Sequence, residues 1–358
     1  MSSQSTDMHR VVEAALTVEQ THPRLGRLYA ACLIAARAHI CILPIAPAGC
    51  GKSVVSRSLY QSIKPSMRFD SITRSGLVKL QDEFTGYSGL LVVDDLGKID
   101  TAYGRTGTVT TMCELVYSHF VTKHSGRDAI VVENFNGSAI LNCQPVVFRW
   151  VVLGDEWDAT IADKTLRYYH FYRPEAPTED ELPDMQFQDI AIADVEPPKT
   201  SSKEYAVLRE LGQVQWSRAR VDEHWSKLLR AVAALDGRKA VTREDMIIAN
   251  TIFRPMFTER HLMRRRALES ERDFDNDLLC FFVEWASHGP FTIDDIMEDY
   301  HVSQSTAYAI LNKYQRYWQP VGDKPKRFAP SSLPLNSGTD RTMYDVLAEC
   351  GIEFQPID

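Results

Sequence analysis

The feature that most constrains this chain is a glycine-containing turn between an apolar run and a helix-like segment. Residues 40–45 are apolar, residues 46–53 read Ala-Pro-Ala-Gly-Cys-Gly-Lys-Ser, and residues 54–63 follow a helical pattern. This order suits a phosphate-binding loop, because backbone N–H groups of the turn and of the helix N-terminus point at an anion. The sequence therefore predicts an α/β fold with an anion site at the carboxyl end of a strand.

Each part of this loop has an expected role toward ATP and Mg²⁺. Lys52 is expected to reach the β- and γ-phosphates, and the Ser53 hydroxyl to bind the metal. The pattern usually opens with Gly; Ala46 stands there, and alanine is compatible with a negative φ. A turn that binds nothing is the alternative. The predicted nucleotide-binding residues are Ala46, Pro47, Ala48, Gly49, Cys50, Gly51, Lys52 and Ser53.

A second stretch, residues 89–95, reads Gly-Leu-Leu-Val-Val-Asp-Asp. Four apolar residues followed by two carboxylates indicate a buried central strand that ends at the carboxyl edge of a parallel sheet. Asp94 is predicted to join the Mg²⁺ shell and Asp95 to polarise the attacking water. A turn after a strand is the alternative, but a position about 40 residues after the loop favours the catalytic interpretation.

Further along, two apolar runs at residues 129–133 and 138–141 flank Asn-Phe-Asn-Gly. Asn-Gly between apolar runs predicts a hairpin, and residues 109–123 before it follow a helical pattern. Asn142 ends the second run, where a short amide can hold a water against the γ-phosphate or simply begin a turn. Residues 166–173 alternate before Pro174, which predicts a last strand with Arg167 near its start.

Composition is typical of a globular protein, with 44% hydrophobic and 25% charged residues. Lys and Arg number 40 against 48 Asp and Glu, so the formal charge is −8 and any nucleic-acid site must be a local patch. The seven cysteines show no metal-binding spacing, which indicates reduced thiols. Without an apolar core near the N-terminus or a membrane-length apolar run, the expected location is cytoplasmic, with no membrane partner.

Residues 291–328 have the pattern of a helix-turn-helix followed by a hairpin. Ile293, Ile296 and Tyr300 repeat at helical spacing, and Ser303 can cap a second helix. Residues 301–330 carry five Lys and Arg against one Asp, or +4. Docking of a protein is the alternative to DNA binding. The predicted DNA-binding residues are Ser305, Thr306, Lys313, Lys324, Lys326 and Arg327.

The order of these parts resembles the AAA+ ATPase family over about residues 23–260. The resemblance implies a P-loop core with a parallel sheet, a small helical lid and a C-terminal winged helix. It makes Asn142 the sensor 1 residue, Arg167 the arginine finger donated to a neighbour, and Arg220 the sensor 2 arginine, with Arg218 next. The lid pattern looks like minichromosome-maintenance helicases and branch-migration motors, in which residues 129–142 would be a DNA-contacting hairpin. Residues 91–97 look more like helicase loaders and transposon ATPases.

We divide the sequence accordingly. The expected parts are an N-terminal tail (1–22), the ATPase core (23–185), a linker and lid (186–262), a connector and winged helix (263–330) and a C-terminal tail (331–358).

The resemblance implies an ATPase that works on DNA as a ring or filament, a homo-oligomer for which a hexamer is one form. Helicases, translocases, and replication or recombination factors with protein partners of those processes belong to this class. Two alternatives stay open: an ATP-dependent switch, such as an initiator or loader with slow hydrolysis, and a winged-helix adaptor or transcription regulator. Asp95, where many such enzymes carry Glu, favours the switch.

Overall fold

The computed structural model describes most of the chain. Described are residues 8–72, 74–125, 128–153, 157–170, 190–259, 290–300, 303–313, 315–323, 326–334 and 342–349, with positions 182, 183, 185 and 187. The chain divides into two compact units, residues 1–170 with 174–256, and residues 171–173 with 257–358.

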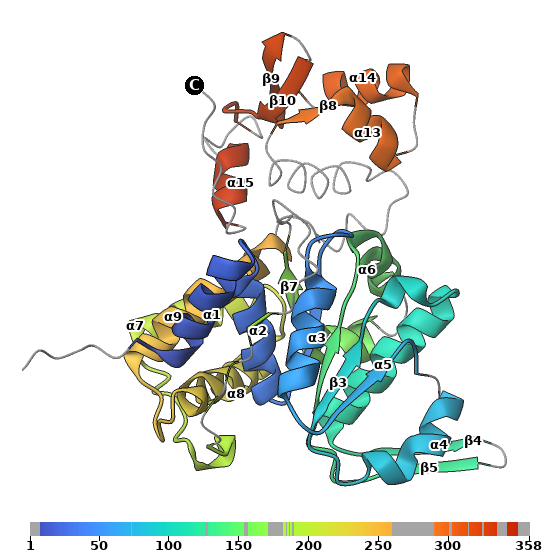
Figure 1. The fold of residues 1–358 in the computed structure, drawn as a ribbon, viewed down its shortest axis with the longest axis vertical. Coiled ribbons are helices and arrows are strands. Elements are labelled where there is room, and N and C mark those ends of the chain that lie inside the picture. The colour runs from blue at the N-terminus through green and yellow to red at the C-terminus, as the bar shows by residue number, and fades with distance from the viewer. Residues whose placement is uncertain are drawn as a thin grey trace, which may run out of the picture. The chain divides into compact units, whose positions relative to one another are not determined.

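The first unit is built around a five-stranded sheet whose strands are all parallel. Its order is β2-β3-β6-β1-β7, and Figure 1 labels two of its strands, β3 and β7. Four of these strands, β1, β3, β6 and β7, are buried throughout, which explains why β1 and β3 read as continuous apolar runs. The predicted α/β class with a parallel sheet is confirmed. The strands are β1 (Cys41–Ile45), β2 (Ser66–Phe69), β3 (Leu90–Val93), β6 (Ser138–Leu141) and β7 (Thr165–Tyr169).

Helices cover both faces of this sheet. Asn142 follows β6 and bonds to Ser56 on α3 (Lys52–Ser62), whereas Cys41 on β1 lies within hydrogen-bonding reach of Cys113 on α5 (Ala102–Ser118). Cys41 is in register with Ala139, three residues before Asn142. Because side chains alternate along a strand, α3 and α5 lie on opposite faces. Helix α2 (Gly26–Arg37) packs against α3 on one face, and α6 (Pro145–Val152) packs against α5 on the other.

The hairpin before β6 differs from the predicted one. It is formed by β4 (Val121–Ser125) and β5 (Asp128–Val132), and β6 instead enters the central sheet between β1 and β3. The Asn-Gly segment is a connector, because Phe135 within it is buried against Phe84 and Tyr87. The prediction of a hairpin between residues 129–133 and 138–141 was therefore wrong. Helix α5 ends at Ser118, before the end of the helical pattern predicted over residues 109–123.

Further helices extend the same unit. Helix α1 (Arg10–Thr21) buries Val11, Ala14 and Val18 and packs on α2, so most of the segment expected as a tail is part of this body. Helices α8 and α9 also contact α2, which places residues of the expected lid in the same unit. The predicted capping box of Thr242 and Asp245 is confirmed. The other helices are α4 (Arg74–Phe84), α7 (Lys203–Gly212), α8 (Arg218–Leu235) and α9 (Arg243–Phe253).

Five short helical turns occur among the described residues of this unit, and the last extends one residue past its end. They are η1 (Leu96–Lys98), η2 (Trp157–Ile161), η3 (Ala162–Lys164), η4 (Ile192–Asp194) and η5 (Arg254–Phe257).

Among its described residues, the second unit combines three helices with a small antiparallel sheet of order β8-β10-β9. Phe291 stacks on Phe328 with ring centroids 5.6 Å apart, and the Trp318 Nε1–H donates to the Leu311 carbonyl at 3.1 Å. Two helices and a hairpin follow in the predicted order, and the predicted turn at residues 301 and 302 lies outside the described residues. The elements are β8 (Phe291–Thr292), α13 (Ile293–Tyr300), α14 (Gln304–Lys313), β9 (Trp318–Asp323), β10 (Lys326–Pro330) and α15 (Met343–Glu349).

Among the described helices, none combines the length and the apolar character that crossing a bilayer requires.

Candidate functional site

The loop between β1 and α3 has the backbone that a phosphate cradle needs. Gly49 and Gly51 adopt positive φ angles of 78° and 77°, a conformation that glycine reaches without steric cost. A Cβ at Gly51 would also lie 2.6 Å from a methyl carbon of Leu25, so a larger residue would have to displace Leu25 in addition to adopting a strained φ. Successive backbone N–H groups around left-handed residues form an anion-binding concavity. The sequence thus predicted both the loop and its position at the carboxyl end of β1.

Lys52, the first residue of α3, is held by the loop itself. Its ammonium donates to the carbonyls of Ala46 at 2.5 Å and Pro47 at 2.7 Å, and the residue is only 8% exposed. A buried ammonium needs such acceptors. A phosphate bound in the loop would exchange these carbonyl bonds for bonds to an anion, at little further desolvation cost.

Asp94 lies beside the end of β6 and forms ion pairs with two basic side chains, those of Arg68 and Lys98. Register places it level with Asn142, since Val93 pairs with Leu141. Its Oδ2 accepts a hydrogen bond from Arg68 Nη2 at 2.6 Å and lies 3.6 Å from Lys98 Nζ. Sequence reasoning missed both partners. A signal for Lys98 was available, since it follows the carboxylate by four residues.

Asp95 has both carboxylate oxygens engaged. Oδ1 caps η1 by accepting from the Gly97 N–H at 2.7 Å, and Oδ2 accepts from Gln144 Nε2 at 3.3 Å. Gln144 is partly exposed and lies three residues after the end of β6, directly before Pro145. Sequence reasoning missed Gln144 and selected Asn142, two residues earlier. A polar residue just before a Pro that begins a helix was the available signal.

Asn142 is placed differently from the predicted role. It is 0% exposed, and its Nδ2 donates to Ser56 Oγ on α3 at 2.9 Å. Its Nδ2 thus ties β6 to α3, while its Oδ1 is buried without a hydrogen-bond partner among the described residues. The amide that does reach the second carboxylate is Gln144.

Arg167 is also placed differently. It is 1% exposed, and its guanidinium donates to the carbonyls of Ala162, Thr165 and Gln215. The Gln215 side chain in turn pairs with the Arg167 backbone, accepting from its N–H at 2.9 Å and donating to its carbonyl at 2.6 Å. Because β7 is an edge strand, Gln215 supplies the pairing that a further strand would give. These bonds hold Arg167 inside its own chain and argue against an arginine finger. Of the other candidates, Arg149 is partly exposed on α6 and Arg173 lies outside the described residues.

Arg220 lies at the opposite edge of the sheet from the loop. Its guanidinium covers the Tyr117 ring at 4.8 Å and donates to Glu223 at 2.9 Å. Tyr117 is near the C-terminal end of α5, and Lys164, also over that ring, precedes β7. Tyr117 and Lys164 therefore lie at the amino edge of the central sheet. A five-residue strand spans roughly 15 Å between this edge and the carboxyl edge. The structure therefore does not bring Arg220 to the nucleotide loop.

The hydrogen-bonded charges around Tyr117 shift the pKa values of Glu223 and of Tyr117 itself. Burial alone raises the pKa of Glu223, but hydrogen bonds from Tyr117, Lys227 and Arg220 lower it to about 2. Burial, together with the Glu223 carboxylate, raises the pKa of Tyr117 to about 12. Such a set of mutually satisfied charges is a structural link between α5 and α8.

The predicted DNA-binding residues lie in the second unit. Ser305 and Thr306 are exposed at the start of α14, with hydroxyls 2.9 and 3.0 Å from Ser303 Oγ. Lys326 and Arg327 are exposed on β10. Lys313 ends α14, and Lys324 lies outside the described residues.

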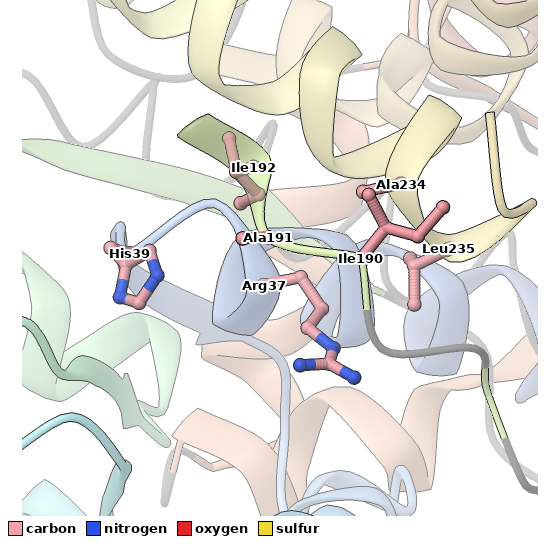
Figure 2. A pocket seen from close by; sticks show the side chains of 7 residues that line it. All are labelled: Arg37, His39, Ile190, Ala191, Ile192, Ala234 and Leu235. Carbon is pink, nitrogen blue, oxygen red and sulfur yellow. The ribbon is translucent and has the colours of Figure 1, made fainter. Parts of the chain in front are cut away.

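A small pocket opens elsewhere in the first unit, near the start of β1 (Figure 2). It holds about 80 Å³ of space open to water-sized molecules, against roughly 300–1,000 Å³ for typical ligand sites. A nucleotide does not fit it. Burial lowers the pKa of His39, one of its polar residues. The lining residues are Arg37, His39, Ile190, Ala191, Ile192, Ala234 and Leu235.

A magnesium site of the kind predicted needs few protein ligands. Within the described residues there is no cluster of three or more His, Cys, Asp or Glu that would hold a metal unaided. Mg²⁺ bound with a nucleotide keeps several waters and takes one or two protein oxygens plus phosphates. The hydroxyl of Ser53, next to Lys52, and the carboxylate of Asp94 fit that requirement chemically.

No family model matches this chain, and no curated protein matches it in sequence.

Proposed function

We propose that this chain is an AAA+-type ATPase that couples ATP binding and hydrolysis to the handling of DNA. One observation carries the proposal: the glycine-containing loop with Lys52 and the strand ending in Asp94 and Asp95 belong to one parallel sheet and open at the same edge. Ligands of open α/β sheets bind outside the carboxyl ends of the strands. The strand between them, β6, delivers Gln144 to the same edge.

The residues divide the work by their chemistry. Backbone N–H groups of the loop and the Lys52 ammonium bind the phosphates, while Ser53 and Asp94 would hold Mg²⁺, which neutralises phosphate charge. The carboxylate of Asp95 and the amide of Gln144, already bonded to each other at 3.3 Å, orient the attacking water. Catalysis of phosphoryl transfer is mostly positioning and electrostatic stabilisation.

Assembly with a second copy is the next part of the proposal. Val146 and Trp150 on α6 and its C-cap residue Leu153 are exposed at spacings of four and three, with Trp150 54% exposed, so they form one apolar stripe. The stripe begins two residues after Gln144, and the same helix carries Arg149. We assign it to the contact between subunits, with Arg149 in the finger role first given to Arg167.

The second unit supplies the DNA contact in this proposal. Its helix pair and hairpin have the order of a winged helix, with α14 as the recognition helix. Ser305 and Thr306 are exposed at its start and Lys326 and Arg327 on the hairpin, where they can neutralise phosphates. A protein-docking role for the same surface is the alternative outcome.

Nucleotide binding and turnover in three variants test the ATPase. Lys52→Ala should abolish ATP binding, because it removes the phosphate cation. Asp95→Asn should bind ATP but lose hydrolysis, and Gln144→Ala should lower the turnover number by about 10²-fold, the usual scale for one positioned polar group. Asn142→Ala is the matched amide control and should change stability rather than turnover. Turnover by the Asp95→Asn protein equal to that of the parent would remove Asp95 from the mechanism.

A slow ATP-dependent switch is the second candidate. It is favoured by the engagement of both Asp95 oxygens and by the two cations on Asp94. Hydrolysis rates with and without DNA separate the candidates: strong stimulation supports a motor, slow turnover in both conditions supports a switch, and no turnover supports an adaptor.

A further inference from the structure

The cations on Asp94 form an asymmetric arrangement. Arg68 Nη2 and Lys98 Nζ approach the same oxygen, Oδ2, at 2.6 and 3.6 Å. The Asp94 side chain is only 11% exposed, whereas the side chains of Arg68 and Lys98 are 46% and 54% exposed. The carboxylate is therefore fixed in a nearly dry position, while its partners reach it from solvent.

Backbone register explains how Arg68 arrives there. On the edge strand β2, Arg68 pairs with Val92, two residues before Asp94. Residues two apart share a face of the sheet, so Arg68 and Asp94 both face the α3 side, where the phosphate loop lies. Lys98 comes from η1, directly after the carboxylate pair.

Burial imposes a charge requirement on Asp94. A buried carboxylate without a positive partner is strongly unfavourable, so some cation must be present whether or not a ligand is bound. A partner that is half-exposed returns to water at low cost, because it regains its hydration. This combination suits a counter-ion that is exchanged rather than one that is permanent.

Resting on the proposed function, we propose that Arg68, assisted by Lys98, is an ionic latch on Asp94 that Mg²⁺ displaces when it enters with a nucleotide. The latch keeps the empty site in charge balance. It also makes the metal compete for Asp94, so metal-free nucleotide does not release it. Arg68 is thus a positioning residue that sets the Mg²⁺ dependence of nucleotide binding.

Binding of ATPγS, a slowly hydrolysed ATP analogue, measured by calorimetry at a series of Mg²⁺ concentrations tests the latch. Arg68→Gln should lower the Mg²⁺ concentration at half-maximal affinity by about tenfold, the scale of one charge-assisted hydrogen bond. Lys98→Gln should lower it by about twofold, because that pair is longer and more exposed. Arg68→Lys, which keeps the charge, should stay close to the parent.

Arg209→Gln is the matched control. It removes the same charge and breaks an Arg–Asp pair, with Asp222 at 3.0 Å, on α7 and α8. It should leave the Mg²⁺ midpoint unchanged, and melting curves of all variants show whether they fold.

The outcomes distinguish the two proposals. A parent that binds no ATPγS refutes the proposed function, and the latch with it. A parent that binds, with an Arg68→Gln midpoint equal to its own, refutes the latch alone. Weaker binding by Arg68→Gln at saturating Mg²⁺ would make Arg68 a phosphate ligand and would also overturn the latch.

Discussion

Arg167→Ala should cost folding stability rather than catalysis. The guanidinium of Arg167 fills a space between β7, η3 and the segment before α8, where three backbone carbonyls accept from it. The same group lies over the Trp157 ring at 5.1 Å. Truncation to alanine removes all of these bonds at once and creates a cavity beside the edge strand.

The magnitude follows from what is left behind. The carbonyls of Ala162 and Gln215 lose a buried donor, at about 1–3 kcal/mol each, and the lost contact with Trp157 adds about 1 kcal/mol. We expect the free energy of unfolding to fall by about 3–7 kcal/mol, out of the roughly 5–15 kcal/mol typical of a domain. For a unit of this size that corresponds to a melting temperature lower by roughly 10–20 °C.

Urea denaturation followed by far-UV circular dichroism measures the change, with nucleotide binding checked below the transition. Arg149→Ala is the control, and as a substitution of a partly exposed arginine it should change stability by less than about 1 kcal/mol. A Gln215→Ala variant should show strong non-additivity with Arg167→Ala, because the two side chains share one network.

One result would refute this reasoning. Arg167→Ala protein that is as stable as the parent, binds ATP and does not hydrolyse it would behave as an arginine finger. Hydrolysis recovered on mixing it with Lys52→Ala protein would then place Arg167 in a site shared between subunits.

Three further predictions concern pH and DNA. Burial lowers the pKa of both His39 and His224, so these histidines are protonated in the unfolded chain at a higher pH than in the folded one, below about 6.5. The free energy of unfolding should therefore fall as the pH is lowered from about 7 to 5. It should fall less steeply in a variant in which both histidines are replaced by Gln. Burial alone raises the pKa of Asp245, but hydrogen bonds from His9 and Arg238 hold it well below its usual range, so its contribution is present above about pH 4 and lost at lower pH. Asp245→Asn should thus cost about 3 kcal/mol at neutral pH and less at acid pH, in urea titrations at both. Replacing Lys326 and Arg327 by Ala should reduce the slope of log K against log salt for duplex binding by about 0.9 per lost phosphate contact, and an unchanged slope would assign the hairpin to protein docking.

The local parts of this protein were predictable from sequence. The loop at residues 46–53 depends on two glycines at positive φ and on neighbours in the chain, and the strand before Asp94 is a run of four apolar residues. The capping box of Thr242 and Asp245 spans a single turn. Each is determined by interactions within a few residues, so the pattern of residues was sufficient.

Only the tertiary structure decided which polar groups meet at the site. Asn142 and Gln144 both follow β6, and the choice between them depends on packing against α3, which buries the first. Arg68 reaches Asp94 because β2 lies next to β3, and the Asn-Gly segment is no hairpin because β6 has two better partners in the central sheet.

The arginines show the same limit most clearly. Arg167 and Arg220 have the expected positions along the chain, yet one is enclosed by carbonyls and the other lies at the amino edge of the sheet. A long charged side chain takes its environment from whichever elements fold around it. Such contacts join residues tens of positions apart, and no short-range pattern in the sequence encodes them.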